Sequence, residues 1–150
     1  MERLAMPNHS VKKILSKDLL AIAGLDAICF PNGSWKVEDF SSMIDVGGFG
    51  YLVSNAGISI GFLFAQKIND EIEILRIATL PAFQRSGYAD VLIIQLLASI
   101  KEKTKLFLEV RDSNLHAKKL YKKHGFQEIN KRDGYYKNPV ETAVVLARIV

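Results

Sequence analysis

One junction constrains the fold of this chain more than any other stretch: a strand-like run leads through a loop with one glycine into a long apolar helix pattern. Residues 71–80 carry the strand pattern, residues 84–89 read Gln-Arg-Ser-Gly-Tyr-Ala, and residues 86–103 repeat apolar side chains at helical spacing. A glycine turn here directs backbone N–H groups outward at the positive end of a helix. We therefore expect the loop to bind an anion such as a phosphate or pyrophosphate. The alternative is that Gly87 only closes a tight connection and that Arg85 is ordinary surface charge.

The remaining periodicity predicts helices first and then a sheet. The predicted helices cover residues 16–30, 35–44, 86–103 and 115–124. The predicted strands cover residues 49–54, 58–67, 71–79, 105–110, 126–131 and 142–150, with residues 3–6 as a short extra edge strand. Ser16, Ser34 and Asn114 are the expected helix N-caps, and Gly125 is the expected residue just after the last helix. Residues 134–136, Gly-Tyr-Tyr, are the expected turn between the last two strands.

The order of these elements indicates the topology. Three consecutive strands with short turns precede the loop, which predicts an antiparallel meander, and the following helix allows a parallel crossover to residues 105–110. A dinucleotide-binding βαβ unit is disfavoured, because its fingerprint has three glycines and only Gly87 is present. We predict an α+β fold: one domain over residues 1–150, with a mixed, mostly antiparallel sheet of about six or seven strands and about four helices.

Composition limits the partners and the compartment. A formal charge of +4 favours anionic partners, but the excess is small for a dedicated nucleic-acid binder. The single cysteine, Cys29, excludes an intramolecular disulfide framework and a cysteine-based zinc cluster, and the three histidines show no metal-site spacing. No apolar run approaches the ~20 residues that span a bilayer, and the first residues lack a signal-peptide pattern. We therefore expect a cytoplasmic protein that uses neither a metal nor a membrane.

A second motif, downstream of the loop, narrows the function. Residues 108–114 read Leu-Glu-Val-Arg-Asp-Ser-Asn and are followed by Ala117, Leu120-Tyr121 and Gly125-Phe126. The loop of residues 84–89 matches the pattern Gln/Arg-x-x-Gly-x-Gly/Ala. In this order and spacing the two motifs resemble the GNAT family of acyl-CoA-dependent N-acetyltransferases, above all its branch that acetylates protein N-termini. The resemblance is good from about residue 49 to residue 150 and loose over the first helices.

The resemblance implies acetyl-CoA as co-substrate and no metal. The backbone amides of the loop would hold the pyrophosphate, and the end of the preceding strand would bind the pantetheine arm as though it were another strand. Asn114 would cap its helix and also contact this arm. The implied acetyl-CoA-binding residues are Ile77, Ala78, Thr79, Arg85, Ser86, Gly87, Tyr88, Ala89, Asp90 and Asn114.

Glu109 and Tyr121 are the catalytic residues that the resemblance implies. Glu109 interrupts an apolar run near the end of a predicted strand, where a carboxylate can act as general base for an acceptor amine. Its structural alternative is an ion pair with Arg111, two residues along the same face. Tyr121 would give its phenolic proton to the departing CoA thiolate, or it is an ordinary core tyrosine. The amine would attack the thioester directly, so we expect no covalent enzyme intermediate.

The resemblance places the acceptor between the first helices and the closing hairpin. It implies Trp35, Tyr135 and Tyr136 as substrate-binding residues, although two adjacent tyrosines also suit the packing of a turn. The family branch has Phe-Pro-Trp where residues 30–35 of this chain read Phe-Pro-Asn-Gly-Ser-Trp, so an insertion falls where the acceptor should bind. We expect the acceptor to be the α-amino group of a protein or peptide N-terminus, with ribosomal proteins among the candidates.

Other functions stay open at this point. They are acetylation of a small-molecule amine or of a lysine side chain, and non-catalytic regulation by CoA binding. Four lysines of the last predicted helix form a solvated face, or they meet the 3′-phosphate of CoA or an acidic RNA: Lys118, Lys119, Lys122 and Lys123. We expect no dedicated nucleic-acid binding, and a monomer or a weak dimer.

Overall fold

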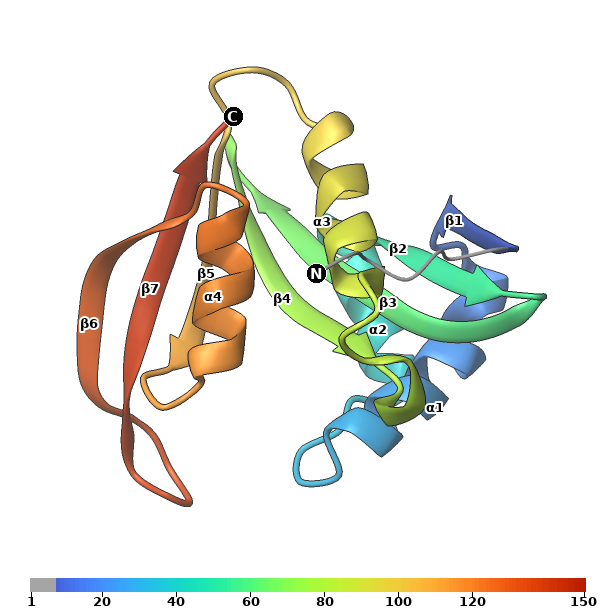
Figure 1. Ribbon diagram of the computed structural model, residues 1–150, viewed down its shortest axis with the longest axis horizontal. Helices are drawn as coiled ribbons and strands as arrows, with labels where there is room; N and C mark the ends of the chain where they lie inside the picture. The colour runs from blue at the N-terminus through green and yellow to red at the C-terminus, as the bar shows by residue number, and fades with distance from the viewer. Residues whose placement is uncertain (1–7) are drawn as a thin grey trace.

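A seven-stranded sheet in the order β1-β2-β3-β4-β5-β7-β6 organises the computed structural model, which describes residues 8–150 (Figure 1). The strands are β1 (His9–Lys13), β2 (Gly48–Asn55), β3 (Ile58–Ile68), β4 (Glu71–Thr79), β5 (Lys105–Arg111), β6 (Gln127–Tyr136) and β7 (Glu141–Ile149). The helices are α1 (Leu19–Cys29), α2 (Val37–Asp45), α3 (Tyr88–Ala98) and α4 (Leu115–Lys123), with 3-10 turns η1 (Ser16–Asp18) and η2 (Pro81–Phe83). The predicted α+β fold with a mixed, mostly antiparallel sheet is confirmed.

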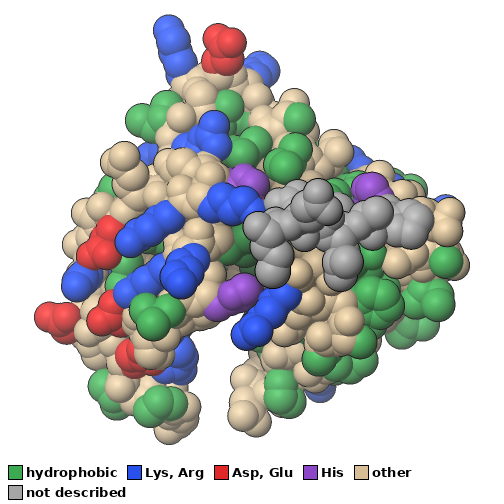
Figure 2. Space-filling view, viewed as in Figure 1, with side chains coloured by type: hydrophobic (Ala, Val, Ile, Leu, Met, Phe, Trp, Pro, Cys, Tyr) green, Lys and Arg blue, Asp and Glu red, His purple; other side chains and the backbone are tan. Residues whose placement is uncertain are grey.

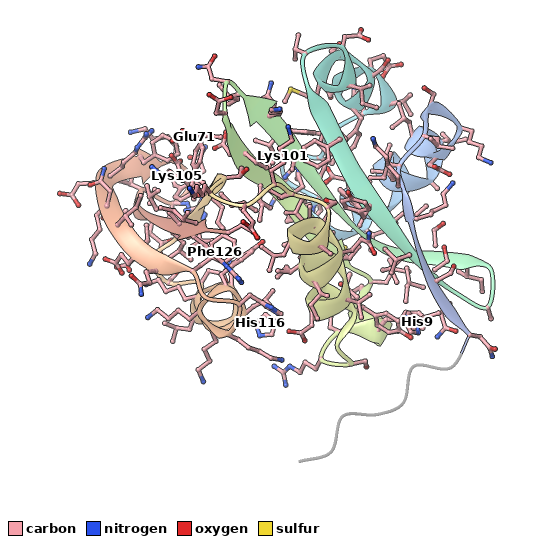
Figure 3. The ribbon with its side chains drawn as sticks, turned by 90° about the horizontal axis from the view of Figure 1, so that it is seen from above. His9, Glu71, Lys101, Lys105, His116 and Phe126 are labelled. Atoms are coloured by element: carbon pink, nitrogen blue, oxygen red, sulfur yellow. The ribbon has the colours of Figure 1, made fainter. Side chains whose placement is uncertain are left out.

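The pairing of β4 with β5 is short, and this shortness creates the site. The two strands run parallel and pair only where residues 71–73 lie beside residues 105–107, while every other neighbouring pair in the sheet is antiparallel. Glu71 and Lys105 lie at this paired end, with 3.7 Å between Oε1 and Nζ (Figure 3). Beyond it the strands diverge (Figure 1). The predicted meander of β2, β3 and β4 and the parallel crossover through α3 are both present.

Each face of the sheet has its own hydrophobic cluster. On one face, Leu92 and Leu96 of α3 are buried in the same cluster as Leu106 and Leu108 of β5. On the other face, α1 and α2 pack on β2, β3 and β4. The ring of Phe40 in α2 there meets those of Phe62 and Phe64 edge-to-face, with centroids 5.8 and 5.1 Å apart, an arrangement that aromatic quadrupoles favour.

Strand β1 was not predicted, and its composition explains why. Residues 9–13 read His-Ser-Val-Lys-Lys, and only Val11 is partly buried, so no alternating pattern signals a strand. β1 pairs with β2 alone at the edge of the sheet, where charged side chains are common. The predicted edge strand of residues 3–6 lies outside the described residues.

Two predicted helix caps are wrong. α2 begins after Lys36, whose N–H donates to a carboxylate oxygen of Asp39 at 2.8 Å, and the N–H of Leu15 donates likewise to Asp18 at 2.8 Å. The N-cap positions are therefore Leu15 and Lys36, and in each case the hydrogen bond runs from the N-cap N–H to a carboxylate three residues on. Asn114 does cap α4, since its side chain accepts the N–H of Ala117 at 3.0 Å. α3 ends at Ala98, earlier than the predicted residue 103.

The closing hairpin also differs from its prediction. β6 continues through Tyr136, so the Gly-Tyr-Tyr sequence lies within the strand and the turn is formed by residues 137–140. Between Arg132 and Tyr136 the register with β7 shifts, and Gly134 has a φ of +63°. The irregularity therefore occurs inside the strand, where glycine tolerates it. None of the helices in residues 8–150 is long and apolar enough to span a membrane.

Candidate active site

The divergence of β4 and β5 opens a pocket of about 470 Å³. It is lined by Phe30, Asn32, Ile74, Leu75, Arg76, Ile77, Leu108, Glu109, Val110, Arg111, Asn114, Ala117, Tyr121 and Tyr136. The structure thus brings both predicted catalytic residues, Glu109 and Tyr121, into one cavity. Asn114 and Ile77, predicted to contact the pantetheine arm, line the same pocket. This volume is typical of a small-molecule site.

The predicted anion loop forms a second, smaller hollow of about 70 Å³ at the end of β4. It is lined by Thr79, Phe83, Gln84, Arg85, Gly87, Tyr88, Ala89 and Asp90. Arg85 and Gly87 have φ values of +61° and +92°, and Gly87 is the N-cap of α3. Left-handed residues next to a helix start are typical of backbone nests that bind anions. The Gln84 side chain donates to the carbonyl of Thr79 at 3.0 Å and so ties the loop to β4.

Asp90 contributes a negative charge close to this loop, and it contacts Lys123 at the end of α4 and His124, the next residue. Oδ1 of Asp90 lies 2.7 Å from Nε2 of His124 and 3.0 Å from Nζ of Lys123. His124, just after the C-terminus of α4, thus makes a side-chain contact to α3. Because the carboxylate has these partners, an anion at the loop meets a compensated charge rather than a bare one.

Lys and Arg side chains gather over α4 on the face that Figure 2 shows. Lys118 contacts the carboxylate of Asp112, and Lys123 contacts that of Asp90, as described above. Lys119 and Lys122 are exposed. Two of the four lysines are therefore engaged in local ion pairs, and the other two are exposed to solvent.

Glu109 does not pair with Arg111. Its Oε1 lies 3.3 Å from Nη1 of Arg132 on β6, across the intervening strand β7. Arg111 contacts Glu141 at 3.4 Å and donates to main-chain carbonyls of the closing turn. The prediction of an Arg111 partner failed because it considered one strand only, while the hairpin brings a second arginine across the same face.

Tyr121 is 2% exposed, and its ring packs edge-to-face on Phe126 with centroids 5.3 Å apart. Burial raises the pKa of the Tyr121 hydroxyl well above its ordinary value. The group therefore stays protonated at physiological pH. A protonated phenol that lines the pocket is a hydrogen-bond donor, which is what a departing thiolate requires.

The three predicted acceptor residues occupy different places. Tyr136 lines the pocket, and the guanidinium of Arg111 lies 4.5 Å from its ring centroid. Tyr135 is exposed and does not line the pocket; the charge of Glu109, a hydrogen bond with it and burial raise the Tyr135 pKa. Trp35 packs against Phe40 and Phe64 and does not line the pocket either. Only Tyr136 of this trio is in position to touch a substrate there.

Several residues near the site were missed from the sequence. Phe30, Asn32 and Arg76 line the pocket, although only the insertion in residues 30–35 had drawn attention. The pKa of Glu73 in β4 is raised, mainly by burial and secondly by the nearby negative charge of Glu109. The available signal was a charged residue at each of two interior positions of β4, Glu73 and Arg76, in addition to Glu71 at its start. Among residues 8–150, no group of three or more His, Cys, Asp or Glu side chains could hold a metal ion.

A loop suited to a phosphate-bearing donor, next to a pocket with a carboxylate and a phenol, is the equipment of a group-transfer enzyme. The chain belongs to the acetyltransferase (GNAT) family, whose profile matches residues 20–126. Family membership and acetyltransferase activity, both expected from the motifs, are thereby confirmed.

Two relatives and two solved structures illustrate the similarity. Over 101 residues the chain is 43% identical to the [ribosomal protein bS18]-alanine N-acetyltransferase of Haemophilus influenzae, covering 64% of this chain and 68% of that one. Over 145 residues it is 28% identical to the Escherichia coli protein of the same name, covering 93% and 96%. The crystal structure of the ribosomal-protein-S18-alanine N-acetyltransferase from Escherichia coli has a TM-score of 0.87 at 26% identity, over 95% of this chain and 94% of that one. Arabidopsis thaliana Naa50, in complex with the bisubstrate analogue CoA-Ac-MVNAL, has a TM-score of 0.82 at 22% identity, over 95% and 99%, and shows the common fold.

Proposed function

We propose that this protein transfers the acetyl group of acetyl-CoA directly to the α-amino group of a protein N-terminus, with the N-terminal alanine of a ribosomal protein as the leading acceptor. The observation that carries the proposal is the meeting of Glu109 and Tyr121 in one pocket, beside the loop of residues 84–89. The names of the bacterial relatives support this acceptor, since those proteins are alanine N-acetyltransferases of ribosomal protein bS18.

The donor site follows from β4 and the loop. Beyond residue 73, β4 has no ladder pairing with β5, so its main-chain groups near Ile77 are available to the amides of the pantetheine arm. Asn114 lines the same pocket. The first-turn N–H groups of α3, at Tyr88, Ala89 and Asp90, would bind the pyrophosphate, for which both their hydrogen bonds and the helix dipole are favourable.

The chemistry needs one base and one acid. The acceptor ammonium first loses a proton to the Glu109 carboxylate, directly or through a water molecule, and the neutral nitrogen then attacks the thioester carbonyl and releases its second proton as the amide forms. A main-chain N–H near Ile77 polarises the carbonyl oxygen. As the carbon–sulfur bond breaks, Tyr121 donates to the departing thiolate. A thiol pKa of ~8.5 already makes the thiolate a tolerable leaving group, so the base matters more than the acid.

The test is a panel of acceptors incubated with the purified protein and acetyl-CoA. It contains a peptide with the alanine N-terminus of ribosomal protein bS18, the same peptide with a blocked N-terminus and an internal lysine, and a polyamine. Tandem mass spectrometry locates the acetyl group, and we expect it on the α-amino nitrogen. Acetyl found only on lysine or on the polyamine would replace this acceptor with another one. Calorimetric binding of acetyl-CoA without turnover of any amine would instead favour a CoA-binding regulator.

Two further properties belong to this proposal. A ribosomal-protein acceptor, as in the names of the relatives, is made in the cytoplasm, and we expect the enzyme to act there. We also expect a monomer or a weak dimer in solution, which light scattering over a range of protein concentrations tests.

A further inference from the structure

One wall of the active-site pocket is the loop between α1 and α2. Residues 30–36 form this loop, and Phe30 and Asn32 line the pocket. These residues include the insertion that distinguishes this chain from the Phe-Pro-Trp pattern. The loop therefore departs from that pattern and lines the space that an acceptor would enter.

Arg76 of β4 makes three contacts with this loop. Its Nη2 donates to the carbonyl oxygen of Gly33 at 2.8 Å. Its guanidinium carbon lies 4.6 Å from the ring centroid of Phe30 and 4.7 Å from that of Trp35, which are cation–π distances. One side chain thus contacts the first, the middle and the last part of the loop.

Asp26 of α1 fixes this arginine and the loop together. Its side chain is 0% exposed, its Oδ1 lies 3.2 Å from Nε of Arg76, and its Oδ2 accepts the N–H of Trp35 at 2.6 Å. Burial raises the pKa of Asp26, while the Trp35 N–H and the charge of Arg76 act in the opposite direction. The buried carboxylate therefore depends on the two partners that it positions.

Stability alone does not explain an arginine here. The neighbours Ile74, Leu75 and Ile77 are apolar, and replacing a buried ion pair by apolar side chains of similar volume is often neutral or stabilising. The pair is instead well suited to hold one conformation of the loop, because each partner makes one hydrogen bond to it: Arg76 donates to the carbonyl of Gly33, and Asp26 accepts the N–H of Trp35. Arg76 also lines the pocket itself.

We propose that Arg76 is a positioning residue for the acceptor: it fixes the loop conformation in which Phe30 and Asn32 face the incoming peptide. This inference rests on the proposed acetyl transfer to a peptide N-terminus. Arg76 does not line the hollow formed by the loop of residues 84–89, so we expect the pyrophosphate contacts of acetyl-CoA to be unaffected by its replacement.

The test compares steady-state kinetics of wild type, Arg76→Lys, and the double variant Asp26→Asn with Arg76→Met. Lysine keeps the charge but lacks a planar group that reaches both rings and Gly33. The double variant leaves no unpaired carboxylate in the core. For both we expect the acceptor-peptide KM to rise about tenfold, with kcat within about twofold and the acetyl-CoA Kd unchanged. Arg148→Lys is the matched control, because Arg148 is also a strand arginine that donates to a main-chain carbonyl, that of His124, but lies outside the pocket.

Trp35 provides a second readout, since it is the single tryptophan of the chain. We expect acrylamide to quench Trp35 fluorescence more strongly in both variants, at an unchanged Tm, because the ring loses its contact with the guanidinium. An acceptor KM that stays at the wild-type value in both variants overturns the inference while the proposed function stands. So does a lowered Tm in both variants with parallel losses for acceptor and acetyl-CoA, which indicates a merely structural role. If wild type acetylates only another amine, the proposed function fails, and an unchanged KM for that amine and unchanged quenching overturn the inference as well.

Discussion

Replacing Glu109 by glutamine separates chemistry from folding, because the substitution removes a charge and keeps the shape. The Glu109 side chain is 14% exposed, and its partner Arg132 is 53% exposed. An ion pair with so exposed a partner contributes about 0–1 kcal/mol, and the glutamine oxygen still accepts a hydrogen bond from the same arginine. We therefore expect a Tm within a few degrees of wild type and an unchanged Kd for acetyl-CoA.

Activity should fall much further than stability. A positioned general base contributes about 10²–10⁴ in rate, so we expect kcat/KM for the acceptor to fall roughly 10²–10³-fold at pH 7, about 3–4 kcal/mol. The deficit should shrink as the pH rises. An α-amino group has a pKa of about 7.7–8.0, so at higher pH the acceptor is neutral before it binds and depends less on the base.

The assay follows release of the CoA thiol with a chromogenic disulfide, at saturating acetyl-CoA, from about pH 6.5 to 9.5 around the α-amino pKa. Glu73→Gln is the matched control, since Glu73 is a neighbouring carboxylate that does not line the pocket. A fall of less than about threefold would show that Glu109 is not the base. A large loss of kcat/KM that is equal at every pH would indicate that Glu109 orients the acceptor and is not the base.

Three further substitutions test other parts of the site. Tyr121→Phe should lower kcat about tenfold and leave the urea midpoint unchanged, because the ring contact with Phe126 remains; an unchanged kcat would reduce Tyr121 to a core residue. Gly87→Ala places a Cβ at a φ of +92°, a strain of about 1–2 kcal/mol, and should raise the acetyl-CoA Kd in calorimetry but not the acceptor KM; equal changes in both would contradict the loop assignment. Glu73 has a pKa raised above 4.5 in the folded state, so its ionisation costs native stability as the pH rises through that folded pKa. Glu73→Gln should therefore melt at a higher temperature than wild type at pH 7 but not below about pH 4, and equal melting at pH 7 would refute this sign.

Much of the fold was predictable because its signals are local. The meander of β2, β3 and β4 follows from alternating apolar and polar residues separated by short turns. The parallel crossover from β4 to β5 needs only a connecting helix of sufficient length. β1 escaped because an edge strand with one partly buried residue, Val11, lacks alternation. The serine caps failed because the N-cap positions fall at Leu15 and Lys36, whose own N–H groups donate to Asp18 and Asp39 in the first turn.

In the site, too, the features that follow from local sequence were predictable, and those that depend on contacts between distant elements were not. Glu109 and Tyr121 lie in one motif of the sequence, and their convergence follows from a strand and the helix after it. The partner of Glu109 could not be read this way, because Arg132 reaches it across β7. The roles of Phe30 and Arg76 depend on how the α1–α2 loop lies on β4, which no spacing along the chain expresses.

The proposed binding sites for the two substrates differ in how their geometry is fixed. In our proposal the pyrophosphate of the donor is bound by main-chain groups of one contiguous junction, so side-chain substitutions elsewhere should leave the geometry of that junction largely unchanged. The loop of residues 30–36, which we propose to face the acceptor, is instead held by contacts of the Asp26 and Arg76 side chains, which lie on different elements of the fold. We expect a substitution at Asp26, at Arg76 or in this loop to change the position of the loop without replacing Glu109 or Tyr121. Under the roles that we propose, acceptor choice can therefore change while the donor loop, Glu109 and Tyr121 stay the same.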